Sequence, residues 1–172
     1  AGITWTTYNF NTQADVSRVT SIDSLNWYAL VAATLYKSND AGNSWVSVQN
    51  NLVGLVDFEH FDTSLSYVSK ISGVHKIRNN GSNWSASAPY SVGFPEMSFS
   101  DTMHGAVTKS TWQGASYKLP RIAVTKDGMN SWQVLAINSN SSALDIFFRD
   151  TSNIWVCTNY GSIYHYDPDN AF

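Results

Sequence analysis

The chain has 172 residues, of which 43% are hydrophobic and 14% aromatic but only 13% charged, and its formal net charge is −3. Such a composition excludes intrinsic disorder, and the acidic balance argues against an electrostatic nucleic-acid binder. No apolar run approaches the ~20 residues that a membrane-spanning helix needs, and the single cysteine, Cys157, excludes an internal disulfide framework. We therefore expect one compact domain without membrane insertion. The first residues contain no signal-peptide pattern, so localisation stays open.

Short runs of β-branched and aromatic residues follow one another along the whole chain, each bounded by Gly, Asn, Asp or Ser. This pattern predicts strands and turns, and no segment shows the 3.6-residue periodicity of an amphipathic helix. The fold class is therefore predicted as all-β. In chain order the predicted strands cover residues 3–10, 19–22, 27–31, 35–37, 44–51, 56–58, 65–68, 83–90, 97–99, 103–107, 122–124, 131–138, 146–148, 154–157 and 163–165.

An internal repeat organises these strands. Trp5, Trp45, Trp84, Trp132 and Phe172 follow one another at intervals of 40, 39, 48 and 40 residues. A repeat of about 40 residues with four short strands is typical of a β-propeller blade. We predict one propeller of four blades, at about 14–52, 53–94, 95–140 and 141–172 plus 1–10, in which the N-terminal strand completes the last blade. The alternative is a half-ring completed by a second copy, because Phe172 already occupies a Trp position.

A turn motif recurs just before four of these aromatic positions. Its best copy, Ser38–Trp45, matches the pattern Ser/Thr-x-Asp-x-Gly-x-x-Trp at every defined position, and the other three copies are degenerate. A carboxylate in such a turn accepts backbone hydrogen bonds, glycine allows a positive φ, and tryptophan buries apolar surface below the turn. The predicted structural residues are Ser38, Asp40, Gly42, Trp45, Asn79, Gly81, Trp84, Thr125, Asp127, Trp132, Asp167 and Phe172.

Through these motifs the whole chain resembles the Asp-box (bacterial neuraminidase repeat) propellers, which include sialidases, sortilin-like receptors and photosystem assembly factors. The resemblance implies architecture only, because the boxes of that family lie at the periphery, away from the active site. A sialidase also needs an arginine cluster and a tyrosine nucleophile with a glutamate partner. This chain has four arginines at scattered positions and only two glutamates, Glu59 and Glu96, and the catalytic propeller of that family is considerably longer. We therefore expect no enzyme and keep glycosidase activity as the least favoured alternative.

No metal site or cofactor is predicted. The histidines lack the spacing of a zinc site. The acidic segment around His60, with Asp57, Glu59 and Asp62, alternates like a strand, so we expect its polar side chains to face water or a turn.

A long connection between two strands of the third blade marks the predicted binding face. The third interval is the longest, and its surplus lies between residues 109 and 121, on the propeller face that usually binds ligands. An aromatic platform beside amide and cationic groups suits a carbohydrate or a peptide; alternatively, Trp112 folds back onto its own blade. The predicted ligand-binding residues are Trp112, Gln113, Tyr117, Lys118, Arg121 and, from the corresponding turn of the fourth blade, Tyr160.

Two functions remain open at this point. The first is a lectin-like or peptide-binding module that uses this face, with a carbohydrate or protein as its partner. The second is a structural interaction protein, such as a virion or appendage component, which docks through its surface or forms a homo-oligomer.

Overall fold

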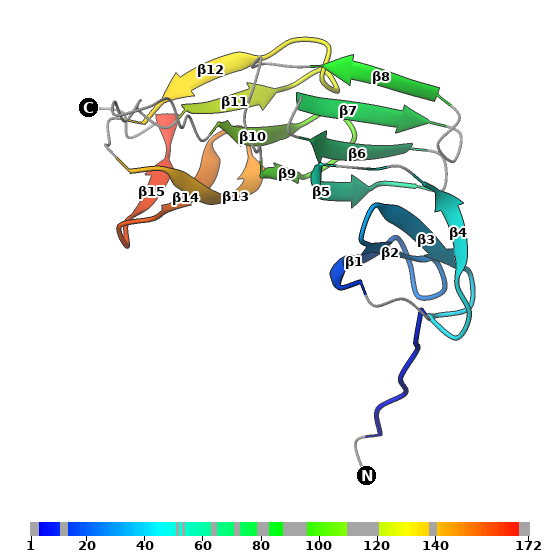
Figure 1. The fold of residues 1–172 in the computed structure, drawn as a ribbon. Helices are drawn as coiled ribbons and strands as arrows, with labels where there is room; N and C mark the ends of the chain where they lie inside the picture. The colour runs from blue at the N-terminus through cyan, green and yellow to red at the C-terminus, as the bar shows by residue number, and fades with distance from the viewer. Residues whose placement is uncertain are drawn as a thin grey trace. The chain divides into compact units, whose positions relative to one another are not determined.

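The computed structural model describes residues 4–10, 14–50, 52, 54–62, 65–70, 73–78, 83–87, 96–109, 121–137 and 141–168. The chain divides into two compact units, residues 1–53 and 54–172. All regular elements in the described residues are β-strands, which form four antiparallel sheets (Figure 1). The predicted all-β class is confirmed.

The first unit contains one four-stranded sheet in the order β1-β2-β3-β4. Its strands are β1 (Val16–Ser21), β2 (Trp27–Val31), β3 (Thr34–Ser38) and β4 (Val46–Gln49). The side chains from Tyr28 to Val31 on β2 are at most 3% exposed, so this apolar strand is buried on both faces.

The second unit contains three sheets. The first is β5 (Leu55–His60), β6 (Leu65–Lys70), β7 (Gly73–Arg78) and β8 (Asn83–Ser87), and the second is β9 (Met97–Phe99), β10 (Gly105–Lys109), β11 (Arg121–Thr125) and β12 (Gln133–Ala136). The third has three strands, β13 (Ala143–Asp150), β14 (Asn153–Thr158) and β15 (Ile163–Tyr166). In each sheet the strands pair in chain order, as four successive up-and-down units.

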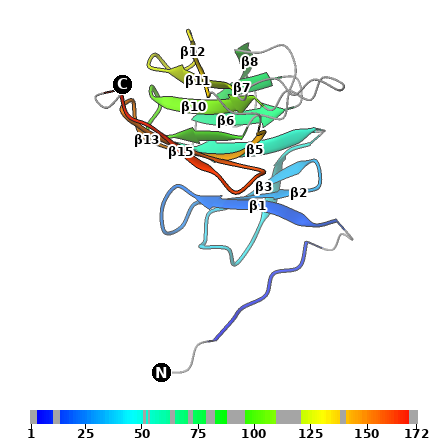
Figure 2. The same cartoon turned by 90° about the vertical axis from the view of Figure 1, so that its left-hand side faces the viewer.

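The predicted elements differ from the observed ones in two places. β7 was not predicted, because Gly73 and the charged residues Lys76 and Arg78 interrupt its apolar pattern. The predicted closing strand is not among the strands of the described residues: residues 4–10 form an extended segment outside the four sheets (Figures 1 and 2), and the described part of the last sheet contains β13, β14 and β15. Tyr8 and Phe10 instead contact side chains of the first sheet. Closure of a four-bladed ring is therefore not confirmed.

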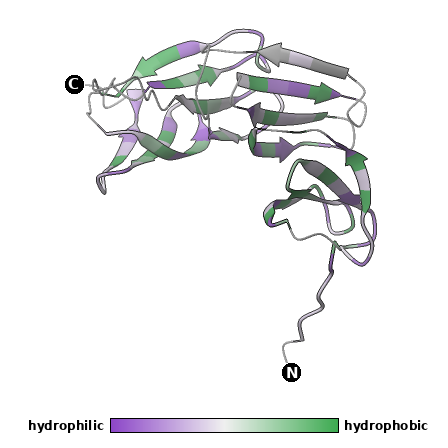
Figure 3. Cartoon of the chain, in the orientation of Figure 1, coloured by the Kyte–Doolittle hydropathy of each residue, from purple (hydrophilic) through white to green (hydrophobic). Residues whose placement is uncertain are grey.

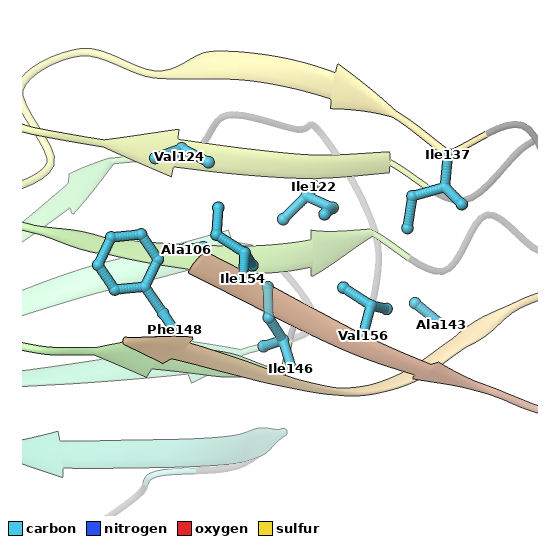
Figure 4. Packing of buried hydrophobic residues seen from close by; sticks show 9 residues of the cluster. All are labelled: Ala106, Ile122, Val124, Ile137, Ala143, Ile146, Phe148, Ile154 and Val156. Carbon is cyan, nitrogen blue, oxygen red and sulfur yellow. The ribbon is translucent and has the colours of Figure 1, made fainter. Parts of the chain in front are cut away.

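An apolar core joins the sheets β9–β12 and β13–β15. Apolar and polar residues alternate along the strands (Figure 3), so that Ile154 and Val156 of β14 are buried while Trp155 between them is not. Figure 4 shows the buried side chains of both sheets meeting in one layer. In Figure 4, Val124 and Phe148 lie toward one end of this layer and Ile137, Ala143 and Val156 toward the other, with Ile122, Ile146 and Ile154 between them.

Polar side chains join the first strands of neighbouring sheets. Asp57 of β5 is only 7% exposed, and its two oxygens accept the N–H groups of Phe58 at 2.8 Å and Met97 of β9 at 3.4 Å. Glu59 accepts the N–H of Phe99, with its nearer oxygen at 3.1 Å. The prediction that these carboxylates face water or a turn was wrong. The buried Asp57 carboxylate is tolerated because it accepts two backbone N–H groups, one from β5 itself and one from the neighbouring sheet.

A side chain also accepts a backbone N–H between the sheets β9–β12 and β13–β15, where Phe148 N–H of β13 donates to Ser98 Oγ of β9 at 3.0 Å. The sheets β5–β8 and β9–β12 are also connected near the turn between β11 and β12, where Lys76 Nζ of β7 donates to the carbonyl of Gly128 at 2.6 Å.

Candidate functional site

The turn between β3 and β4 shows what the repeated motif does. The Oδ1 atom of Asp40 accepts hydrogen bonds from Ser38 Oγ at 2.7 Å and Ser44 N–H at 2.8 Å, and Oδ2 accepts Ser44 Oγ at 2.6 Å. Gly42 has a φ of 88°, and its carbonyl accepts the indole N–H of Trp45 at 3.0 Å. These contacts hold a tight turn between β3 and β4.

The turn between β11 and β12 repeats this geometry. Asp127 accepts Thr125 Oγ1 at 2.9 Å, Ser131 N–H at 2.9 Å and Ser131 Oγ at 2.5 Å. Its glycine lies one place earlier than in the first box, yet Gly128 and Met129 both have positive φ, 66° and 71°, as the corresponding Ala41 and Gly42 do. Two successive positions therefore take the left-handed conformation, which explains why the motif tolerates glycine at either.

The two box carboxylates are engaged by hydrogen bonds within their own turns. Hydrogen bonds from Ser44, and then from Ser38, lower the pKa of Asp40 from 3.8 to about 2, and hydrogen bonds from Ser131 and Thr125 lower the pKa of Asp127 to the same value. Each is thus ionised near neutral pH, with its oxygens used by the turn. This agrees with the structural role predicted for both.

The remaining box residues are described only in part. Trp132 directly precedes β12 and is half-buried, and Asp167 directly follows β15. Trp84 lies in β8, where the backbone alone is described. Asn79, Gly81 and Phe172 lie outside the described residues.

The predicted binding residues that the structure describes lie at the opposite end of the sheets from the box turns. Arg121 is exposed at the start of β11, opposite Lys109 and Ala136 in the ladders. Tyr160 lies in the turn between β14 and β15. Arg121 begins the third strand of its sheet, and Tyr160 lies between the second and third strands of the next sheet, so the two residues lie at corresponding ends of their sheets. Trp112, Gln113, Tyr117 and Lys118 lie outside the described residues.

The turn that carries Tyr160 is tightly held. Thr158 N–H donates to the Ser162 carbonyl at 3.0 Å, and Gly161, with a φ of 73°, donates to the Thr158 carbonyl at 3.3 Å. Asn159 bonds twice to Ser142, through its own N–H at 3.1 Å and through Oδ1, which accepts Ser142 N–H at 2.9 Å. Tyr160 itself is 68% exposed. A well-ordered turn therefore presents an aromatic ring to solvent.

An apolar cavity of about 210 Å³ lies between the two sheets that carry these residues. Ile122, Leu135 and Ile137 line it on the side of β11 and β12, and Val156, Tyr164 and Tyr166 line it on the side of β14 and β15. Sequence reasoning missed this cavity, although the alternation of Tyr164 and Tyr166 with exposed His165 marks the face that lines it.

The described residues contain no group of three or more His, Cys, Asp or Glu side chains that could hold a metal ion. Among them there is also no helix long and apolar enough to cross a membrane.

Comparisons with known proteins show the fold. No protein-family model matches the chain, and no curated protein is similar to it in sequence. Among solved structures, YCF48 bound to a D1 peptide matches with a TM-score of 0.67 and 16% identity, over 97% of this chain and 55% of that one. An ancestral GH74 enzyme matches with a TM-score of 0.69 and 20% identity, over 96% of this chain and 24% of that one. The GH74 enzyme of Niastella koreensis matches with a TM-score of 0.61 and 20% identity, over 89% and 29%.

These similar structures are β-propeller proteins, so the chain has a propeller-like architecture. It spans about half the length of YCF48 and about a quarter of the GH74 enzymes.

Proposed function

We propose that the chain is a non-enzymatic binding module of the Asp-box propeller type, which recognises a peptide segment of a partner protein. The contact surface is the end of the sheets that carries Arg121, Tyr160 and the connection between β10 and β11. The proposal rests on the exposure of the Tyr160 ring, which lies on a turn held by four hydrogen bonds. Rigid, exposed aromatic side chains lose little conformational entropy on binding and dominate many interfaces.

Charge and similarity both favour a peptide. Arg121 is exposed at the same end of the sheets, and an arginine there suits a carboxylate or carbonyl group of a peptide. YCF48 has this fold and is bound to a D1 peptide in its structure. The ionised, hydrogen-bonded state of Asp40 and Asp127 supports a module without catalysis at the boxes.

A carbohydrate is the second candidate ligand. Tyrosine rings stack on sugar rings as well as on peptide groups, and GH74 enzymes share the fold. Peptide and carbohydrate binding differ in their response to Arg121→Ala. For a peptide, we expect high salt to weaken binding to the wild type, because salt screens the ionic contact between Arg121 and a peptide carboxylate, and we expect Arg121→Ala to remove this salt dependence. Binding of a neutral glycan depends little on salt in either protein.

The test is a parallel screen of the full chain against a peptide array and a glycan array, followed by affinity measurements with the best ligand. We expect Tyr160→Ala to weaken binding at least tenfold, the effect of losing about 1.4 kcal/mol of contact energy. Phe147→Ala is the matched control, because Phe147 is 61% exposed in the same sheet but on the strand β13. Equal affinities of Tyr160→Ala and the wild type would refute the site, and glycan binding without peptide binding would favour the second candidate.

A further inference from the structure

The turn that carries Tyr160 is longer than the corresponding turn of the sheet β1–β4. The β2–β3 ladder closes at the pair Val31 and Thr34, with residues 32 and 33 between them. The β14–β15 ladder closes at the pair Cys157 and Ile163, with residues 158–162 between them. Each ordered residue of a loop costs conformational entropy. The longer turn therefore needs bonds that the shorter one does not need.

One backbone hydrogen bond is common to the two turns. Ala32 N–H, directly after β2, donates to the carbonyl of Asp15, directly before β1, at 3.2 Å. Asn159 N–H, directly after β14, donates to the carbonyl of Ser142, directly before β13, at 3.1 Å. In both sheets this bond links the end of the second strand to the start of the first. It is thus a feature of the repeated sheet and is not specific to the turn of Tyr160.

The side chain of Asn159 adds a bond that the shorter turn cannot make. Its Oδ1 atom accepts the Ser142 N–H at 2.9 Å, whereas the methyl group of Ala32 offers no acceptor. Two bonds in opposite directions between the same two residues restrain rotation as well as distance. Because Asn159 directly precedes Tyr160, this anchor limits the backbone rotations that would swing the tyrosine ring.

The residues after Tyr160 are held from the other side of the turn. The Ser162 carbonyl accepts the Thr158 N–H at 3.0 Å and Thr158 Oγ1 at 3.2 Å, and Thr158 is only 5% exposed. Gly161 donates to the Thr158 carbonyl at 3.3 Å. These bonds order the backbone on both sides of Tyr160, whose ring remains exposed.

We propose that Asn159 is a positioning residue for ligand binding by Tyr160, because its side chain holds the turn to the start of β13 and so orients the ring before the ligand arrives. This role rests on the proposed binding function of Tyr160. A group that is ordered beforehand loses less conformational entropy on association, and the gain appears as affinity without any contact between Asn159 and the ligand. A single exposed hydrogen bond contributes little to global stability. Substitution of Asn159 should therefore change affinity more than stability.

The test measures binding to the full chain by fluorescence anisotropy. The probe is a fluorescein-labelled copy of the tightest-binding array peptide or, if only glycans bind, of the tightest-binding glycan. We expect Asn159→Ala to weaken binding about threefold to tenfold, the scale of the entropy cost of ordering one side chain. Asn159→Asp keeps an acceptor for the Ser142 N–H and should restore the wild-type affinity when all variants are compared at high salt, where the added charge is screened.

Asn153→Ala is the matched control. Asn153 also makes a side-chain bond next to a turn of this sheet, to Asp150 Oδ1 at 2.9 Å, but at the end of β14 opposite to Asn159. Its substitution should leave the affinity unchanged. Equal losses in Asn153→Ala and Asn159→Ala, or no recovery in Asn159→Asp, would show a general effect on the sheet and overturn the proposal.

A double-mutant cycle separates positioning from direct contact. In the Tyr160→Ala background there is no ring to orient, so Asn159→Ala should cause no further loss of affinity. An additive loss would mean that Asn159 itself touches the probe, which would overturn the proposal. Hydrogen exchange of the Gly161 N–H, measured without a probe, should be faster in Asn159→Ala than in the wild type and in Asn159→Asp. Equal exchange in all three proteins would also overturn it.

The positioning role and the binding function fail in different ways. If no array ligand binds, or if Tyr160→Ala leaves the affinity unchanged, the binding function is refuted and the role of Asn159 with it. If Tyr160→Ala weakens binding but Asn159→Ala does not, the binding function stands and only the positioning role is refuted.

Discussion

The substitution Gly105→Ala tests the packing between the first two strands of the sheet β9–β12. Gly105 lies directly opposite Phe99 in the β9–β10 ladder, and a Cβ atom at position 105 would lie 2.1, 2.3 and 2.6 Å from three ring atoms of Phe99. Carbon atoms pack best at roughly 3.5–4.0 Å, so the ring must move. It is confined, because its centroid lies 4.6 Å from that of Tyr67 and 6.0 Å from that of Phe61.

Two effects of opposite sign compete in this variant. Replacing glycine by alanine inside a strand ordinarily stabilises a protein by roughly 0.5–1 kcal/mol, because the unfolded chain loses freedom. Overpacking of a tightly packed site costs about 1–3 kcal/mol. The overlap includes Cγ of Phe99, which cannot move unless the whole side chain rotates. We therefore expect the free energy of unfolding to fall by about 1–2 kcal/mol.

Urea unfolding of a double-mutant cycle with Phe99→Ala measures this effect. In the Phe99→Ala background the ring is absent, so Gly105→Ala is expected to be neutral or stabilising, with a coupling energy of at least about 1 kcal/mol. Gly161→Ala is a reference variant in which the added Cβ atom has no other atom within 4 Å, so its effect on stability comes from the positive φ of 73° and not from overpacking as at Gly105. A stabilising Gly105→Ala, or the same change in both backgrounds, would refute the packing argument.

Two further predictions concern carboxylates. Asp57→Asn replaces an oxygen that accepts an N–H by an NH₂ group, so the N–H of Phe58 or Met97 loses its acceptor; we expect a loss of about 1–3 kcal/mol in urea unfolding. The control Asp145→Asn, whose carboxylate accepts the N–H of the next residue at 2.8 Å but is exposed, should change stability by less than about 0.5 kcal/mol, and equal effects would contradict the role of burial. The lowered pKa of about 2 at Asp40 and Asp127 predicts stabilisation that is complete above the ordinary pKa of 3.8 and is lost as the pH falls toward 2. Urea midpoints between pH 5 and pH 2 should fall less steeply for Asp40→Asn than for the wild type, and an unchanged slope would refute the linkage.

The tie between Asp57 and β9 shows how neighbouring sheets of the second unit hold their relative position. Apolar packing alone is non-directional and tolerates sliding. Hydrogen bonds from Met97 and Phe99 to Asp57 and Glu59 require one register of β9 against β5. Asp57→Asn therefore tests this register as well as stability.

Local features of this protein could be predicted from its sequence because neighbouring residues determine them. The strand runs, the repeat interval and the box turns at Asp40 and Asp127 depend on hydrogen bonds and side-chain alternation within a few residues. Tyr160 could be placed in a turn for the same reason. The sequence pattern failed at β7, where charged residues on a strand hide its apolar side, and at Asp57, where the alternation of a strand does not show which face another sheet covers.

Tertiary structure decided what depends on residues far apart in the chain. The acceptor role of Asp57 arises only when β9, 40 residues later, packs beside β5. The cavity beside β15 exists because β12 and β15 belong to different sheets that face each other across it. Sequence determined the repeating unit, since local hydrogen bonds and periodicity suffice for it, whereas packing between the sheets of the second unit decided which side chains are buried.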